Sequence, residues 1–84
     1  MKFKELKLPG VFCIDAEPFI DERGAFRRHF CEKEFAENGI VNNMKQSNVS
    51  ENKFAHTLRG FHYQIGEHAE GKTLSCLSGK IFDV

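Results

Sequence analysis

A histidine and two cationic side chains lie close together in the second half of the sequence. His62 stands on a predicted strand over residues 57–64, with Arg59 on the same strand and Lys72 just beyond the loop that follows. Histidine titrates near neutral pH, and packing on a strand holds its side chain in place, so His62 is suited to act as a general base. Neighbouring cations suit a substrate that carries phosphate and develops negative charge on an oxygen. The cluster therefore favours proton transfer on an anionic substrate.

Regular alternation along this strand would place Arg59 and His62 on opposite faces. Gly60 lies between them, and glycine is the residue expected at a β-bulge. We therefore expect an irregularity at Gly60 that turns both side chains to the same side. Taken alone, His62 favours a structural role, because an isolated histidine is more often a core or surface residue than a functional one, and the neighbouring cations are what favour a functional role.

A metal site is a second interpretation of the same region, because two histidines and a glutamate on a β-barrel commonly hold a divalent ion. The candidates are His62, His68 and Glu70. A metal-binding pair on a strand is expected as His-x-His, whereas position 64 is Gln64, a poor ligand. We therefore predict no metal and no other cofactor, and we expect His68 and Glu70 to order the turn that leads to Lys72.

Short strands and turns must position these residues. Apolar or alternating runs at residues 3–8 and 11–14, separated by a Pro-Gly pair, predict two strands around a turn. Residues 21–24 predict a second turn, followed by a strand-like segment, and residues 31–38 carry the helix signal, with a glycine after them as the cap. The other predicted elements are a strand over 40–50, the strand over 57–64, a loop over 65–71 and a hairpin of 73–77 with 80–84.

Composition limits the class of protein. The chain has 84 residues, with 12 basic and 12 acidic side chains, so its charge gives no reason to expect a nucleic acid or an anionic membrane as partner. It has no apolar run near the roughly 18 residues of a membrane span. Three cysteines without a CxxC spacing, and no secretory signal, indicate a reducing cytoplasm. Because the chain is short and ends inside a predicted strand, we expect the amino-terminal piece of a longer protein, or a dimer.

Five blocks of sequence resemble one known family. "FIDERGAF", "QSNVS", "TLRGFHYQ", "HAEGK" and "GKIFDV" follow one another in the order and near the spacing seen in the amino-terminal half of the dTDP-4-dehydrorhamnose 3,5-epimerase family. These are cupin-fold sugar-nucleotide epimerases. The resemblance implies an all-β, cupin-type jelly-roll β-sandwich with one short helix near residues 31–38. It also implies that residues 1–84 are the amino-terminal part of a single domain, and that the protein is a homodimer in which an amino-terminal strand segment crosses to the partner.

The resemblance implies a catalytic role for two residues. His62 matches the general base that removes the acidic proton next to the 4-keto group of a dTDP-4-keto-6-deoxyhexose. Lys72 matches the family lysine that supplies a cation to the enolate oxygen. Such a carbon acid needs a base with a pKa near neutrality and a cation on the developing oxyanion, so the chemistry fits the assignment. Reprotonation from the opposite face would then epimerise C3, C5 or both.

The resemblance also implies five substrate-binding residues. Arg23 and Arg59 match arginines that contact the diphosphate and nearby polar groups. Gln46 and Asn48 match a polar pair, in keeping with the alternation that puts them in one polar column of the predicted 40–50 strand. Phe26 matches an aromatic residue that lines the nucleotide end of the site. Without the family, residues 21–24 are equally compatible with an ordinary exposed turn, and Phe26 with a core position.

Two departures separate this chain from the family pattern. Where family members usually carry an acidic substrate contact, this chain has Arg28, which leaves open a different 4-keto sugar nucleotide or epimerisation at one carbon only. The tyrosine acid of the family, and the aspartate that pairs with the base, belong to the carboxy-terminal half. A metal-dependent cupin of another activity and a non-catalytic sugar-nucleotide-binding cupin module are the alternative interpretations.

Overall fold

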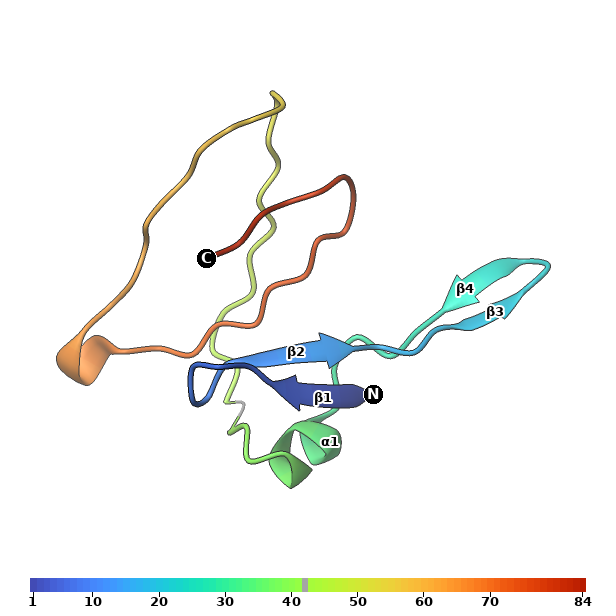
Figure 1. Cartoon of the computed structure of the whole chain (residues 1–84), viewed down its shortest axis with the longest axis horizontal. Coiled ribbons are helices and arrows are strands. Elements are labelled where there is room, and N and C mark those ends of the chain that lie inside the picture. Colours follow the sequence, from blue (N-terminus) through green and yellow to red (C-terminus); the bar gives the residue numbers. More distant parts are fainter. Residues whose placement is uncertain (42) are drawn as a thin grey trace. The chain divides into compact units, whose positions relative to one another are not determined.

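Two β-hairpins and a short helix make up most of the regular structure (Figure 1). The computed structural model describes residues 1–41 and 43–84, in two units that span Met1–Ser47 and Asn48–Val84. The elements are β1 (Lys2–Glu5), β2 (Phe12–Asp15), β3 (Phe19–Asp21), β4 (Gly24–Phe26), α1 (Glu32–Glu37) and a 3-10 turn (Gly66–His68). The described structure therefore holds two small antiparallel sheets and little helix, as expected for a β-rich class of protein.

The first hairpin confirms the two strands predicted around Pro9 and Gly10. Strands β1 and β2 pair antiparallel, with Phe3 opposite Ile14. Both of these side chains are half-buried, so the hairpin has one apolar face. The turn is closed where the Gly10 N–H, at a φ of +80°, donates to the Glu5 Oε1 atom at 2.8 Å. Glycine fits this position because it adopts positive φ at little cost.

The second hairpin confirms the predicted turn at residues 21–24. Strands β3 and β4 pair antiparallel, with Asp21 opposite Gly24, so Glu22 and Arg23 form the two-residue loop. The Arg23 N–H donates to the Asp21 Oδ1 atom at 2.9 Å, the local bond through which aspartate favours turns. Strand β4 ends at Phe26. The longer strand-like segment predicted beyond that residue is wrong, because the residues that follow it have no strand partner.

The core of the first unit forms around one aromatic side chain. Phe35 of α1 is only 1% exposed. The rings of Phe3 and Phe30 contact it edge-on, with centroid distances of 5.3 and 4.9 Å. Such edge-to-face pairs add to the free energy that burial of the ring already provides. Phe35 therefore joins the first hairpin to the helix.

The predicted helix at residues 31–38 is also confirmed, one residue shorter at each end. Gly39, with a φ of +73°, donates its N–H to the Ala36 carbonyl at 3.0 Å, and Ile40 donates to the Phe35 carbonyl at 2.9 Å. This pair of bonds is a Schellman motif, which satisfies carbonyl groups at the end of a helix. The glycine cap predicted from the sequence therefore ends α1.

An ion network ties the amino terminus to the helix. The Met1 amine lies 2.9 Å from the Glu34 Oε1 atom, and the Arg28 Nη1 atom lies 3.0 Å from the Oε2 atom of the same carboxylate. Hydrogen bonds from the amine, and then from Arg28, lower the pKa of Glu34 to about 2. The bond to Glu34 is in turn the main cause that raises the pKa of the amine. Glu34 therefore links β1, the segment after β4 and α1.

The four strands predicted in the rest of the chain are wrong. Among the described residues of the ranges 40–50, 57–64, 73–77 and 80–84, no strand is formed, and residue 42 lies outside the described part. A strand needs a neighbour for its backbone N–H and C=O groups, and an apolar face needs something to pack against. Here Phe61 and Tyr63 are 81% and 79% exposed. In the described structure, no element packs against the apolar side chains whose alternation predicted these strands.

Removal of the Phe35 ring should destabilise the protein strongly. In the protein expressed from its complete reading frame, we expect Phe35→Ala to lower the free energy of unfolding by about 3–5 kcal/mol, through lost burial and the cavity left behind. Urea denaturation followed by circular dichroism measures this. Leu8→Ala, which shortens an exposed side chain in the first hairpin turn, should change it by less than about 0.5 kcal/mol. Equal losses in both variants would contradict the placement of the core.

Glu34 should make stability depend on pH in the acid range. Its folded pKa lies below the ordinary 4.5, so its contribution is present above about pH 4.5 and is lost as pH falls towards about 2. Glu34→Gln should therefore be less stable than the parent protein near pH 7, and the gap should narrow below about pH 4.5 and close only below about pH 2. Thermal unfolding at several pH values measures the gap. A gap that stays constant with pH would argue against the ion network.

Candidate active site

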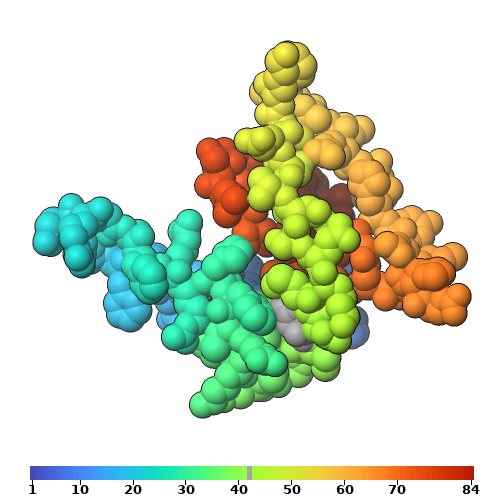
Figure 2. Space-filling model, turned by 180° about the vertical axis from the view of Figure 1, so that it is seen from behind, coloured from blue at the N-terminus to red at the C-terminus, as the bar shows by residue number. Residues whose placement is uncertain are grey.

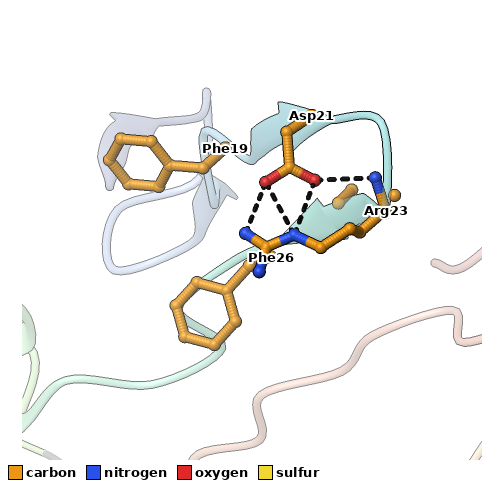
Figure 3. Close-up of a pocket in the computed structure, with 6 residues that line it drawn as sticks. Phe19, Asp21, Arg23 and Phe26 are labelled. Carbon is orange, nitrogen blue, oxygen red and sulfur yellow. Dashed lines mark hydrogen bonds and ion pairs between the residues drawn. The ribbon is translucent and has the colours of Figure 1, made fainter.

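The second hairpin carries two of the predicted substrate-binding residues. An open hollow of about 510 Å³ on this hairpin is lined by Phe19, Asp21, Arg23, Gly24, Ala25 and Phe26. Phe19 lies opposite Phe26 in the ladder, and both rings are largely exposed, at 80% and 75%. Figure 3 shows the two rings extending from the hairpin next to the paired Asp21 and Arg23. An exposed aromatic pair beside a cation suits a ligand with a flat ring and negative charge.

Asp21 orients the Arg23 guanidinium. The Arg23 Nη2 and Nε atoms lie 2.6 and 3.2 Å from the Asp21 Oδ2 atom, so the carboxylate binds one edge of the fork (Figure 3). This pairing lowers the pKa of Asp21 and raises that of Arg23. A guanidinium has five N–H donors, so the opposite edge still offers donors to a ligand. Asp21 and Phe19 line this hollow although neither was predicted as a site residue, and the Asp-x-Arg spacing within a turn is the signal that could have indicated the ion pair.

The second unit brings Lys72 to His62. The Lys72 Nζ atom donates to the His62 backbone carbonyl at 3.0 Å. The same ammonium lies 3.5 Å from the Glu70 Oε1 atom. Between the two predicted catalytic residues, the chain reverses through the 3-10 turn Gly66–His68, drawn in orange in Figure 1. The loop predicted over 65–71 therefore contains this turn, and the His62 carbonyl accepts a hydrogen bond from the Lys72 ammonium.

Arg59 has polar partners in the same unit. Its Nη1 atom donates to the Ser50 Oγ atom and lies 3.4 Å from the Asn52 Oδ1 atom. The backbone between Arg59 and His62 is irregular, as predicted, since Gly60 has a φ of +120°. A β-bulge in the strict sense requires a paired strand, and the described residues form none here. Hydroxyl and amide groups therefore hold this arginine, in contrast to the carboxylate that holds Arg23.

The predicted site residues are divided between the two units. Arg23, Phe26 and Gln46 belong to Met1–Ser47, and the other four belong to Asn48–Val84: Asn48, Arg59, His62 and Lys72. Gln46 and Asn48 both take part in non-covalent interactions within the chain. Arg28, the departure from the family pattern, is held by Glu34 in the first unit. Arg23 in the first unit, and Arg59 and Lys72 in the second, thus each have a partner within their own unit.

The residues considered for a metal site have other partners. His68 lies 3.5 Å from Glu67, and Glu70 pairs with Lys72. Within residues 1–41 and 43–84, no three His, Cys, Asp or Glu side chains come together in a way that could hold a metal ion. In the same ranges, no helix has the length and apolar character needed to cross a membrane.

Comparison with known proteins identifies the family. The sequence profile of the dTDP-4-dehydrorhamnose 3,5-epimerase family matches residues 5–84. The dTDP-4-dehydrorhamnose 3,5-epimerase of Salmonella typhimurium is 38% identical over 78 residues, which cover 92% of this chain and 42% of that protein. The protein of the same name from Methanothermobacter thermautotrophicus is 39% identical over 83 residues, covering 99% and 44%. No solved structure matches the chain.

These matches confirm the resemblance seen in the sequence. The chain belongs to the dTDP-4-dehydrorhamnose 3,5-epimerase family. It spans less than half the length of these curated relatives. The protein of the same name from Shigella flexneri is likewise covered over only 46% of its length.

The positive φ of Gly60 should make this position intolerant of a side chain. We expect Gly60→Ala to lower the free energy of unfolding by at least about 1 kcal/mol, because alanine adopts a φ of +120° only under strain. Gly71→Ala is the matched control. It has open space around it and no positive φ, so its effect should stay within about 0.5 kcal/mol. Urea denaturation of both variants checks this, and an unaffected Gly60→Ala would mean that the backbone there is regular.

Proposed function

We propose that the protein is a sugar-nucleotide epimerase, an isomerase acting on C3, C5 or both of a dTDP-4-keto-6-deoxyhexose. The observation that carries this proposal is the contact between Lys72 and the His62 carbonyl, in a chain whose relatives are named as epimerases. A proton next to a ketone becomes acidic when a cation stabilises the enolate oxygen, and a base must lie close to the same carbon. We infer that Lys72 supplies the cation and His62 the base, and the contact of the ammonium with the His62 backbone supports this.

In the proposed mechanism His62 removes the proton and Lys72 faces the resulting enolate. The ammonium is anchored beside the His62 backbone, so charge that develops next to the imidazole would meet a cation already in place. The C–H bond breaks, its electron pair moves into the C–C–O system, and the proton goes to His62. A proton delivered to the opposite face then inverts the carbon. We propose that the acid for that step belongs to the part of the enzyme that corresponds to the portion of its relatives not matched by residues 1–84.

The substrate-binding residues are proposed to act at two ends of the sugar nucleotide. Phe26, in the hollow of the second hairpin, would line the nucleotide end, and the open edge of the Arg23 guanidinium would bind an anionic oxygen of the diphosphate. Arg59, Gln46 and Asn48 would supply donors and acceptors to polar groups of the substrate. Arginines that are already hydrogen-bonded to neighbouring side chains suit this task, because they lose less conformational freedom when the substrate binds.

The proposed assembly is a homodimer of jelly-roll domains in the cytoplasm, with residues 1–84 as the amino-terminal part of each domain. The many exposed apolar side chains of the second unit support this, since Phe61, Tyr63 and Ile65 alternate as in a strand whose face is covered. The expected context is the biosynthesis of rhamnose-like sugars for surface polysaccharide. The epimerase names of the relatives do not favour a metal-dependent cupin or a binding module.

Replacement of His62 should abolish proton exchange without abolishing binding. In deuterated water, the protein from the complete reading frame should cause loss of the C3 or C5 proton NMR signal of dTDP-4-keto-6-deoxyglucose. We expect His62→Asn to reduce this rate by at least about 100-fold, the usual contribution of a general base, while affinity for dTDP changes only a few-fold. His68→Asn, in the neighbouring turn, is the control and should retain the rate. Near-normal exchange by His62→Asn would contradict the role of this residue.

A further inference from the structure

Glu70 is the one acidic side chain that pairs with Lys72 among the contacts of the described structure. Its Oε1 atom lies 3.5 Å from the Lys72 Nζ atom, and the two residues flank Gly71 in the chain. The ammonium has a second contact, 3.0 Å from the His62 carbonyl. An ammonium has three N–H donors. The hydrogen bond to the carbonyl engages one of them, and the ion pair with Glu70 places a carboxylate nearby, so a donor remains for an oxygen of the substrate.

We propose that Glu70 is a positioning residue for the proposed reaction, one that holds the Lys72 ammonium beside His62. This role rests on the proposed function. Lysine has a flexible four-carbon stem, and a single hydrogen bond to a carbonyl leaves it with several alternative conformations. A carboxylate on the other side restricts the ammonium to the position from which the enolate oxygen can be reached. The gain lies in the transition state, because the cation needs no reorganisation when charge develops.

Because the Glu70–Lys72 ion pair is exposed, we expect it to position the Lys72 ammonium and to add little to the stability of the fold. The Glu70 and Lys72 side chains are 46% and 43% exposed, and exposed ion pairs contribute little to the free energy of unfolding. A small displacement of a catalytic group, by contrast, has a large effect on rate. Loss of the Glu70 charge should therefore slow the chemical step and leave the fold unchanged.

The same turn offers a matched control. Glu67 is also a glutamate, three residues earlier, and it lies against His68 at 3.5 Å and not against Lys72. Glu67→Gln and Glu70→Gln remove the same charge from the same loop. They therefore share any general effect of net charge, and they differ only in the partner that is lost.

The test compares these variants in the protein expressed from its complete reading frame. Turnover and KM are measured from deuterium incorporation into dTDP-4-keto-6-deoxyglucose by proton NMR. We expect Glu70→Gln to lower kcat about tenfold with KM unchanged, because an interaction made in the transition state is lost. Glu70→Asp, which keeps the charge, should recover part of the rate. Glu67→Gln should match the parent, and the thermal midpoint of all variants should stay the same.

The outcomes separate this role from the proposed function. An active parent with Glu70→Gln at the parental kcat contradicts the positioning role alone. A loss that is equally large in Glu67→Gln, or one that accompanies a lower thermal midpoint, also contradicts it, because it would indicate a general effect of the loop. A folded parent that exchanges no proton contradicts the proposed function, and the role of Glu70 with it.

Discussion

The packing of Phe35 against Phe3 and Phe30 is the interaction on which the first unit depends. Phe35 is the one buried hydrophobic residue among the described residues, and the rings that contact it come from β1 and from the segment that precedes α1. Helices as short as α1 are not stable by themselves in water. The ring therefore stabilises the helix and the hairpin together, and Glu34 on the same helix adds the bonds to the amino terminus and to Arg28. The space-filling view in Figure 2 shows this part of the chain in blue to green.

Local pairing explains how a chain without net charge can present cations to an anionic ligand. The 12 basic side chains are balanced by 12 acidic ones, and several of these lie next to one another in space. Arg23 is held by Asp21 and Lys72 by Glu70, in each case two residues apart in the chain. Each carboxylate uses only part of the donor set of its cation. A balanced sequence can thus contain preorganised cationic groups, and net charge says little about a site of this kind.

Much of the first unit could be predicted from sequence because its elements depend on neighbouring residues. The Pro-Gly turn, the Asp21 turn and the glycine that ends α1 are each specified within a few positions. The five motif blocks likewise identified the family, since the order of such blocks is a property of the sequence itself. The irregular backbone at Gly60 belongs to the same category, because only glycine adopts its φ readily.

The tertiary structure decided what local pattern could not. Alternation over 57–64 predicted a strand, yet a strand exists only where another backbone supplies its hydrogen bonds, and the described chain offers none there. The contact of Lys72 with the His62 carbonyl likewise depends on how the chain folds back through the 3-10 turn. Neighbouring residues alone specify the two hairpin turns, the glycine cap of α1 and the motif blocks of the family. Only the folded chain decided that Lys72 meets the His62 carbonyl and that Arg59 meets Ser50, because these contacts join residues 10 and 9 positions apart.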